Sequence, residues 1–216
     1  MKKLLNYLKL TFQSMIWVFF IVFILDIGTK LGFQHMLQTP GTSITLIPGF
    51  LHLTLLYNTG AGFGIFGNLD NNVLRRTLLI GISIIMSGAF LGIYIWKYKK
   101  LNVAYKVNLM LLLGGAFGNL IDRAFYPNGR VIDFIDVDIG SYTTFPIFNI
   151  ADAALVIGVI MMMIMLIIDE IKEIKGKKAP ADGSSLNEEH NAEETIIEVD
   201  ESKGNDNKNE KNNNNK

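Results

Sequence analysis

The chain has 216 residues, half of them hydrophobic, with a formal net charge of zero and no cysteine. A net charge of zero gives no electrostatic reason to expect a nucleic-acid partner. The lack of cysteine excludes disulfides, thiolate metal sites and cysteine nucleophiles, and three histidines are too few for a histidine-rich metal centre. The apolar residues fall in four long runs, which indicates a multi-pass membrane protein.

The first apolar run follows a lysine-containing start and is predicted to span a membrane at about residues 14–33. A basic start before a short apolar run is also typical of a cleavable signal peptide. No small-x-small cleavage motif follows, and three further runs lie downstream, so we expect an uncleaved helix. Asp26 and Lys30 lie four residues apart near the end of this helix, on one face, where pairing would make both charges tolerable.

The segment after this helix has the composition of strands. Residues 43–58 are rich in Ile, Leu, Thr and Tyr and are interrupted by Pro48-Gly49, which favours a small hairpin or curved sheet. Residues 58–68 then contain four glycines but lack the lysine of a phosphate-binding loop. Such a segment indicates backbone that closely approaches a peptide substrate or a neighbouring helix.

Three further spans are predicted, at about residues 77–96, 103–121 and 148–168. In the span at 103–121, Gly114 and Gly118 are spaced for close helix packing, a pattern of low specificity. A second outer loop, residues 123–147, connects these last two spans. The last span is followed by a change in composition.

From about residue 173 the chain is rich in Lys, Glu, Asn and Ser, and such a segment cannot bury enough apolar surface to fold. We therefore expect an all-α membrane protein with four transmembrane helices in a domain at 1–172. A small extracytoplasmic β-sheet or hairpin completes this domain, and a disordered cytoplasmic tail occupies 173–216.

The basic residues predict how the spans are oriented. Lysines gather at the start, in the linker between the second and third spans, and after the fourth span. The opposite side carries only Lys30, Arg75, Arg76, Arg123 and Arg130. The positive-inside rule therefore places both termini in the cytoplasm, and the sheet and both loops on the outer side.

Three carboxylates stand out between Gly114 and the start of the fourth span: Asp122, Asp133 and Asp152. Asp152 opens an otherwise apolar segment, where an ionisable group is costly and indicates function. Two aspartates held close cannot both ionise readily, so one keeps a proton while the other deprotonates a water. Such a pair could hydrolyse a membrane-bound peptide without a metal or cofactor. The residues alone do not decide between Asp122 and Asp133 as the partner.

Other chemistries find less support in the sequence. A serine–histidine hydrolase would need a nucleophile-elbow motif, and a zinc site would need more ligands. Asp133, Asp136 and Asp138 crowd together as a Mg²⁺ or Ca²⁺ site would require, although a solvated loop face explains the last two more simply. A transporter is the main rival, because intramembrane Asp and Lys also mark ion pathways. Polar groups gathered at one membrane edge, however, do not outline a crossing path.

Five short motifs follow one another along the chain. They are D-x-x-T-K at 26–30, N-T-G-A at 58–61, G-G-A-x-G-N-x-x-D-R at 114–123, V-x-D-F at 131–134 and F-N-x-A-D at 148–152. Over roughly residues 17–168 the chain thereby resembles the bacterial lipoprotein signal peptidase, or signal peptidase II, family. The resemblance implies a metal-independent aspartyl endopeptidase that needs no cofactor. It would remove the signal peptide of a prolipoprotein just before the diacylglyceryl-modified cysteine.

The resemblance also implies roles for individual residues. The catalytic pair would be Asp133 and Asp152, with Asp26, Lys30 and Asp122 as structural support. Five residues would line the site and hold the peptide backbone or the pair: Asn58, Gly60, Asn119, Arg123 and Asn149. Gly62 departs from the second alanine of the family's usual N-T-G-A-A-F, which affects only local substrate fit.

The implied partners are diacylglyceryl-modified prolipoproteins, membrane lipids and globomycin-type inhibitors. The protein is expected to act as a monomer in the bacterial inner membrane. Its active site would face the outer side.

Overall fold

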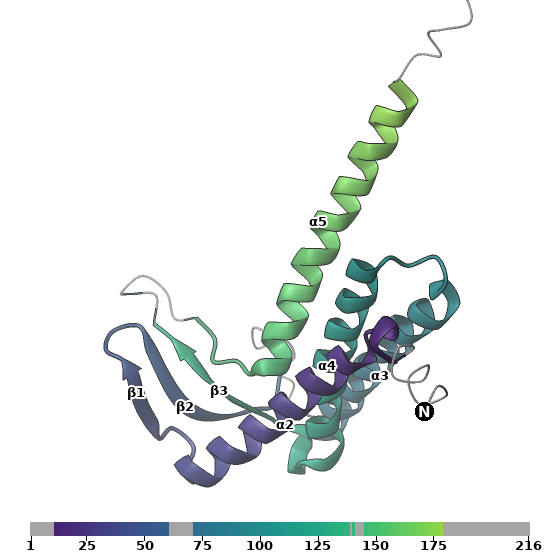
Figure 1. Cartoon of the computed structure of the whole chain (residues 1–216). Helices are drawn as coiled ribbons and strands as arrows, with labels where there is room; N and C mark the ends of the chain where they lie inside the picture. Colours follow the sequence, from purple (N-terminus) through teal and green to yellow (C-terminus); the bar gives the residue numbers. More distant parts are fainter. Residues whose placement is uncertain (1–10, 61–70, 139, 141–144, 179–216) are drawn as a thin grey trace, which may run out of the picture. The chain divides into compact units, whose positions relative to one another are not determined.

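The computed structural model describes residues 11–60, 71–138, 140 and 145–178, with side chains as far as residue 175. The chain divides into two compact units, residues 1–165 and 166–216. The elements in order (Figure 1) are α2 (Ile16–Leu37), β1 (Ser43–Ile47), β2 (Leu51–Asn58), α3 (Asn72–Lys97), α4 (Val103–Phe125), the short 3-10 helix η2 (Pro127–Gly129), β3 (Val131–Val137) and α5 (Ile150–Lys178). The glycines at 62, 64 and 67 and the tail beyond Lys178 lie outside the described residues.

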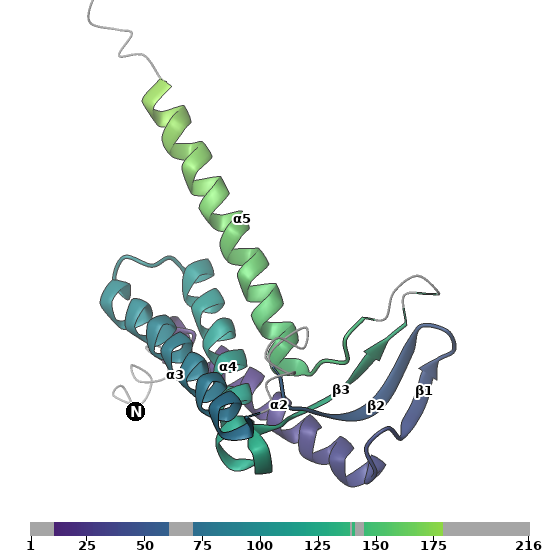
Figure 2. The same cartoon turned by 180° about the vertical axis from the view of Figure 1, so that it is seen from behind.

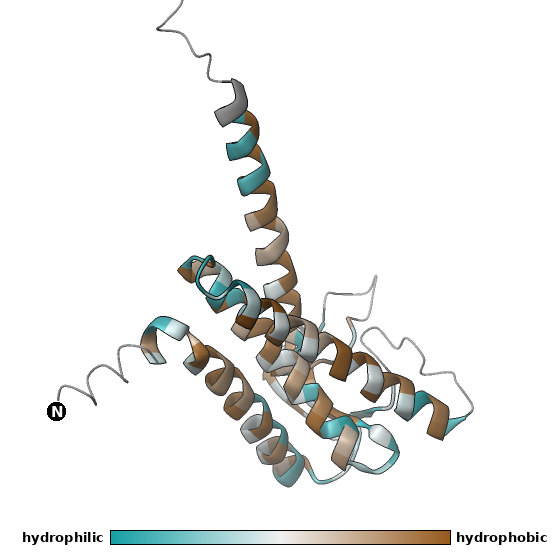
Figure 3. Cartoon of the chain, turned by 90° about the vertical axis from the view of Figure 1, so that its right-hand side faces the viewer, coloured by the Kyte–Doolittle hydropathy of each residue, from teal (hydrophilic) through white to brown (hydrophobic). Residues whose placement is uncertain are grey.

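Helices α2, α3, α4 and α5 are each long and apolar enough to cross a membrane, as predicted. Hydrophobic colouring runs along much of the helical surface in Figure 3. Large apolar side chains point outward from α3, where Ile85 is 70% and Ile95 66% exposed. Exposure on this scale suits contact with lipid, since a soluble protein rarely presents large apolar patches to water.

Asparagine side chains cap the starts of α3 and α4. Asn71 accepts hydrogen bonds from the backbone N–H groups of Val73 and Leu74, so α3 begins five residues before the predicted span. Asn102 likewise accepts from the N–H of Tyr105 at the start of α4. The C-terminal ends of three helices lie beyond the ends of the predicted spans. Helix α2 reaches Leu37, α4 reaches Phe125, and α5 reaches Lys178, which is within the predicted tail.

The three strands form one antiparallel sheet in the order β1–β2–β3. The expected hairpin is confirmed as β1 and β2, but the loop predicted at 123–147 contains the third strand. Asp133 and Asp136 interrupt the apolar pattern of β3, so this segment does not alternate clearly enough to predict a strand. Asp133 therefore lies in a strand opposite Leu56 of β2, and the prediction that it lies in a loop was wrong.

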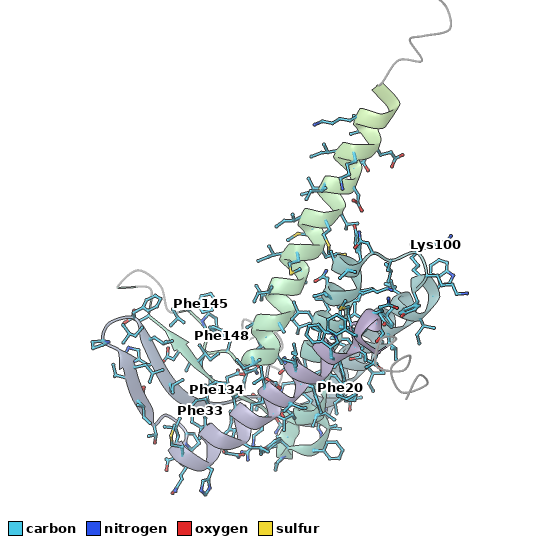
Figure 4. All side chains as sticks on the ribbon, in the orientation of Figure 1. Phe20, Phe33, Lys100, Phe134, Phe145 and Phe148 are labelled. Carbon is cyan, nitrogen blue, oxygen red and sulfur yellow. The ribbon has the colours of Figure 1, made fainter. Side chains whose placement is uncertain are left out.

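The sheet is attached to α2. Leu37, Leu55 and Ile132 form a buried cluster between them, and the rings of Phe33 and Phe134 lie 4.6 Å apart, centroid to centroid (Figure 4). The second half of α2 runs alongside the strands in Figure 1, and Figure 2 shows the same arrangement from behind. This packing holds β3, the strand that carries Asp133, against the end of α2.

Candidate active site

The residues that lead into α5 are tied to β3. The backbone N–H of Ile135 donates to the carbonyl of Phe148 at 2.8 Å, and the N–H of Phe148 donates back at 3.0 Å. Asn149 follows directly, and Asp152 lies in the first turn of α5. This short pairing brings the fourth helix to the strand that carries Asp133.

Asn149 connects the two carboxylates of the predicted pair. Its side-chain oxygen accepts from the N–H of Asp152 at 2.8 Å, while Asp152 Oδ2 accepts from the N–H of Asn149 at 3.4 Å. This reciprocal arrangement is a capping box, which satisfies free N–H groups at a helix start. The side-chain amide of Asn149 also donates to Asp133 Oδ1 at 2.6 Å. One buried amide therefore positions both aspartates.

Asp133 is completely buried. Its Oδ2 accepts a hydrogen bond from Asn58 at 2.9 Å. Burial raises the pKa of Asp133 to about 7, and the nearby charge of Asp152 contributes to the rise, whereas the hydrogen bonds from Asn58 and Asn149 lower it. At neutral pH Asp133 can therefore hold the proton that a carboxylate pair shares.

Asp152 lies in the first turn of α5, at the N-terminal end of that helix. Its Oδ1 accepts from the amide of Asn119 at 2.7 Å. Arg123, one turn further along α4, donates to the carbonyls of Asn119 at 3.2 Å and Gly60 at 3.3 Å. Gly60 in turn donates its N–H to Asn58, so a chain of hydrogen bonds runs from α4 to the end of β2.

A buried network of ion pairs supports the start of α5 and the two aspartates. Lys30 Nζ lies 2.7 Å from Asp26 Oδ2, 2.9 Å from Asp122 Oδ2 and 3.2 Å from Asn119 Oδ1. Asp26 also accepts from the N–H of Ala151 at 2.9 Å, in the first turn of α5. Asp122 Oδ2 lies 3.3 Å from the N–H that precedes Asp133 in β3. The network therefore joins α2 and α4 to the elements that carry the pair.

Glycines of α4 allow the close approach that this network needs. A Cβ at Gly114 would lie 2.9 Å from Cβ of Val22, and one at Gly115 would lie 2.5 Å from the carbonyl oxygen of Ala151. At Gly118 the added atom would lie 2.5 Å from Asp26 Oδ2. The spacing of Gly114 and Gly118 does correspond to close packing against α2, as predicted.

Replacing Gly118 with Ala should destabilise the protein by about 1–3 kcal/mol, because a methyl group there overlaps the Asp26 carboxylate. Thermal unfolding in detergent would measure the loss. Gly88→Ala in α3 is the matched control, since its added Cβ meets nothing within 4 Å and should leave stability equal or slightly higher. Equal effects of the two changes would show that the contact with Asp26 is unimportant.

A pocket of about 790 Å³ lies beside the pair. Its polar part consists of Asn58, Ser83, Asn119, Arg123 and Asp152. Its apolar wall comes from β2, α3, α4, α5 and the segment before α5: Leu56, Leu79, Ile82, Met86, Ala116, Phe145, Pro146, Ile147, Phe148, Ala153, Leu155, Val156 and Ile157. The sequence carried no signal for the α3 residues, because an apolar side chain in a span can face lipid equally well.

All ten residues predicted for the site are brought into one hydrogen-bonded and ion-paired network. Asp122 is in it as a partner of Lys30, and Asp133 rather than Asp122 shares Asn149 with Asp152. Asp136 and Asp138 do not join this network; Asp136 accepts from Thr54 at 2.7 Å, and Asp138 accepts from the N–H of Gly140. Within the described part of the chain, no three His, Asp or Glu side chains are grouped as a metal site requires.

The family model described as signal peptidase (SPase) II matches residues 18–168. A lipoprotein signal peptidase of Staphylococcus carnosus is 41% identical over 151 residues, which cover 70% of this chain and 88% of that protein. The lipoprotein signal peptidase of Enterococcus faecalis is 39% identical over 137 residues, covering 63% of this chain and 78% of that protein.

Two solved structures have a similar fold. One, a bacterial membrane enzyme, is 36% identical and covers 79% of this chain and 94% of its own, with a TM-score of 0.62. The second, also a bacterial membrane enzyme, is 37% identical and covers 71% and 92%, with a TM-score of 0.60. Together with the four apolar helices, these likenesses identify the chain as a multi-pass membrane protein.

Proposed function

This chain belongs to the signal peptidase II family of lipoprotein-processing peptidases, and from that premise we propose that it is an aspartyl endopeptidase with Asp133 and Asp152 as its catalytic pair. Its substrates are prolipoproteins, cleaved just before the diacylglyceryl-modified cysteine. The observation that carries the proposal is the shared Asn149, which holds two carboxylates in different environments. Asp152 lines the pocket, whereas Asp133 is buried with a pKa of about 7.

These two environments support different catalytic roles for Asp152 and Asp133. The charged Asp152 takes a proton from the attacking water while Asp133 gives its proton to the oxygen of the scissile carbonyl. When the tetrahedral intermediate collapses, the carbonyl oxygen returns its proton to Asp133, and Asp152 passes the proton from water to the leaving nitrogen. Asn58 lines the pocket and donates to Asp133, so this amide connects the pocket to the buried acid.

The pocket suits the substrate that the proposal requires. Its apolar wall between α3 and α5 fits an apolar signal-peptide segment or the acyl chains of the modified cysteine. Asn119, Arg123 and Gly60 would orient the peptide backbone, and the network around Lys30 would support them. The lysine distribution favours cytoplasmic termini and a site at the outer face of the bacterial cytoplasmic membrane.

The assay that tests this function is cleavage of a synthetic precursor with a diacylglyceryl-modified cysteine, followed by mass spectrometry. We expect a product that begins at the modified cysteine, formed equally well in strong chelator and blocked by a globomycin-type inhibitor. Solute flux in liposomes without any peptide product would instead support a transporter. Loss of cleavage on metal removal would contradict the two-aspartate mechanism.

The pH dependence of kcat/KM should reflect Asp133. Because Asp133 must be protonated to act as the acid, the rate should fall as pH rises through about 7. Asn58→Ala removes a hydrogen bond that lowers this pKa, so the remaining activity should decline at a higher pH than in the wild type. A decline at unchanged pH in this variant would show that a different group controls the alkaline side.

A further inference from the structure

The face of β2 that carries Asn58 continues into a second pocket. Leu56 and Asn58 line the large pocket beside the pair, whereas His52 and Thr54 line a neighbouring pocket of about 420 Å³. Phe145 lines both pockets, and its ring packs edge-on against Phe148 (Figure 4). Alternate residues of one strand therefore lead from the candidate active site to the second pocket.

The second pocket differs from the first in its chemistry. Thr54 donates to Asp136 Oδ2 at 2.7 Å, and its oxygen lies 2.8 Å from the hydroxyl of Ser43. His52 and the exposed Asp138 complete the polar lining. None of the described residues that line this pocket is Lys or Arg. Among the described residues of this lining, two carboxylates without a neighbouring Lys or Arg favour a ligand with hydrogen-bond donors or positive charge.

We propose that this second pocket binds the substrate residues that follow the modified cysteine, and that it prefers cationic or donor side chains to acidic ones. The inference rests on the proposed function, which places the cleaved bond beside Asp152 and Asn58. An extended peptide advances about 3.3 Å per residue, so Thr54, four positions before Asn58, lies about 13 Å along the strand. Roughly the third and fourth residues after the cleaved bond would reach Thr54 and Asp136.

The direction of the substrate follows from the two linings. The apolar pocket suits the signal-peptide side of the cleaved bond, which lies in the membrane. The polar pocket on the sheet suits the chain that leaves the membrane on the other side. Asp136 therefore acts as a specificity residue, remote from the catalytic pair.

The test uses the full chain in mixed micelles and two diacylglyceryl-modified peptides that differ only in the second to fourth residues after the cleaved bond, Lys in one and Glu in the other. We expect kcat/KM to be about fivefold higher for the Lys peptide, chiefly through KM, which is the upper range for a partly exposed ion pair. Asp136→Asn should bring the ratio close to one, and Asp136→Lys should invert it. Asp169→Asn, which removes an exposed carboxylate outside both pockets, is the charge-matched control and should leave the ratio unchanged.

Several results would overturn the subsite. They are equal cleavage of the two peptides by the wild type, an unchanged ratio in Asp136→Asn, and an equal loss on both peptides in that variant, which would make Asp136 structural. Failure of the wild type to cleave either peptide would overturn the proposed function itself, and the subsite with it.

Discussion

Replacing Asp152 with Asn should lower kcat by at least about 1,000-fold, because an amide cannot take the proton of the attacking water. Asn retains the size of the side chain and can still accept a hydrogen bond from Asn119, and the backbone N–H at position 152 still donates to Asn149, so the helix start should remain intact. Asp133→Asn should cause a loss of similar size, since it removes the proton donor. Both variants are measured by the cleavage assay on a diacylglyceryl-modified precursor.

Stability distinguishes lost chemistry from lost folding in these variants. The pKa of Asp133 rises from 3.8 to about 7 on folding, so the folded state holds the proton more tightly and stability falls as pH rises through that interval. An uncharged Asn escapes this loss but accepts only one of the two amide hydrogen bonds that Asp133 accepts, so the stability of Asp133→Asn should depend less on pH through that interval than that of the wild type. Near-normal activity in Asp133→Asn would refute the pair and return attention to Asp122.

Replacing Lys30 with Met should destabilise the fold by about 3–5 kcal/mol, the usual cost of removing one partner from a buried ion network. Lys30 is 1% exposed, and its loss leaves the carboxylates of Asp26 and Asp122 buried without their cation. Denaturant titration in mixed micelles would measure the change in the free energy of unfolding. Adding Asp122→Asn to Lys30→Met removes one uncompensated charge and should recover part of the loss.

The matched control is the exposed pair of Lys172 and Asp169, whose charged atoms lie 4.0 Å apart. Lys172→Met should cost no more than about 1 kcal/mol, because water screens both charges. Similar losses for Lys30→Met and Lys172→Met would mean that the network around Lys30 contributes little to the fold.

The four apolar helices could be predicted from the sequence because the bilayer imposes a length and a composition on each span. The family could also be predicted, because five short motifs occur in the family's order. The matching family model and the similar lipoprotein signal peptidases confirm it. Strand β3 could not be predicted, since its two aspartates break the alternation that marks a half-buried strand. Its pairing with β2 becomes visible only when both strands are placed in space.

The candidate site shows the same division. Hydropathy alone marks Asp152 as an unusual charge at the start of a span, and the resemblance of the motifs points to Asp133 as its partner. The residue types alone did not decide whether Asp122 or Asp133 is the partner, because sequence spacing does not say which carboxylate lies near Asp152. Tertiary structure separated them: Asp122 pairs with Lys30, whereas Asp133 shares Asn149 with Asp152. The physical reason is the short pairing of Ile135 with Phe148, a contact between distant segments that brings β3 to the start of α5.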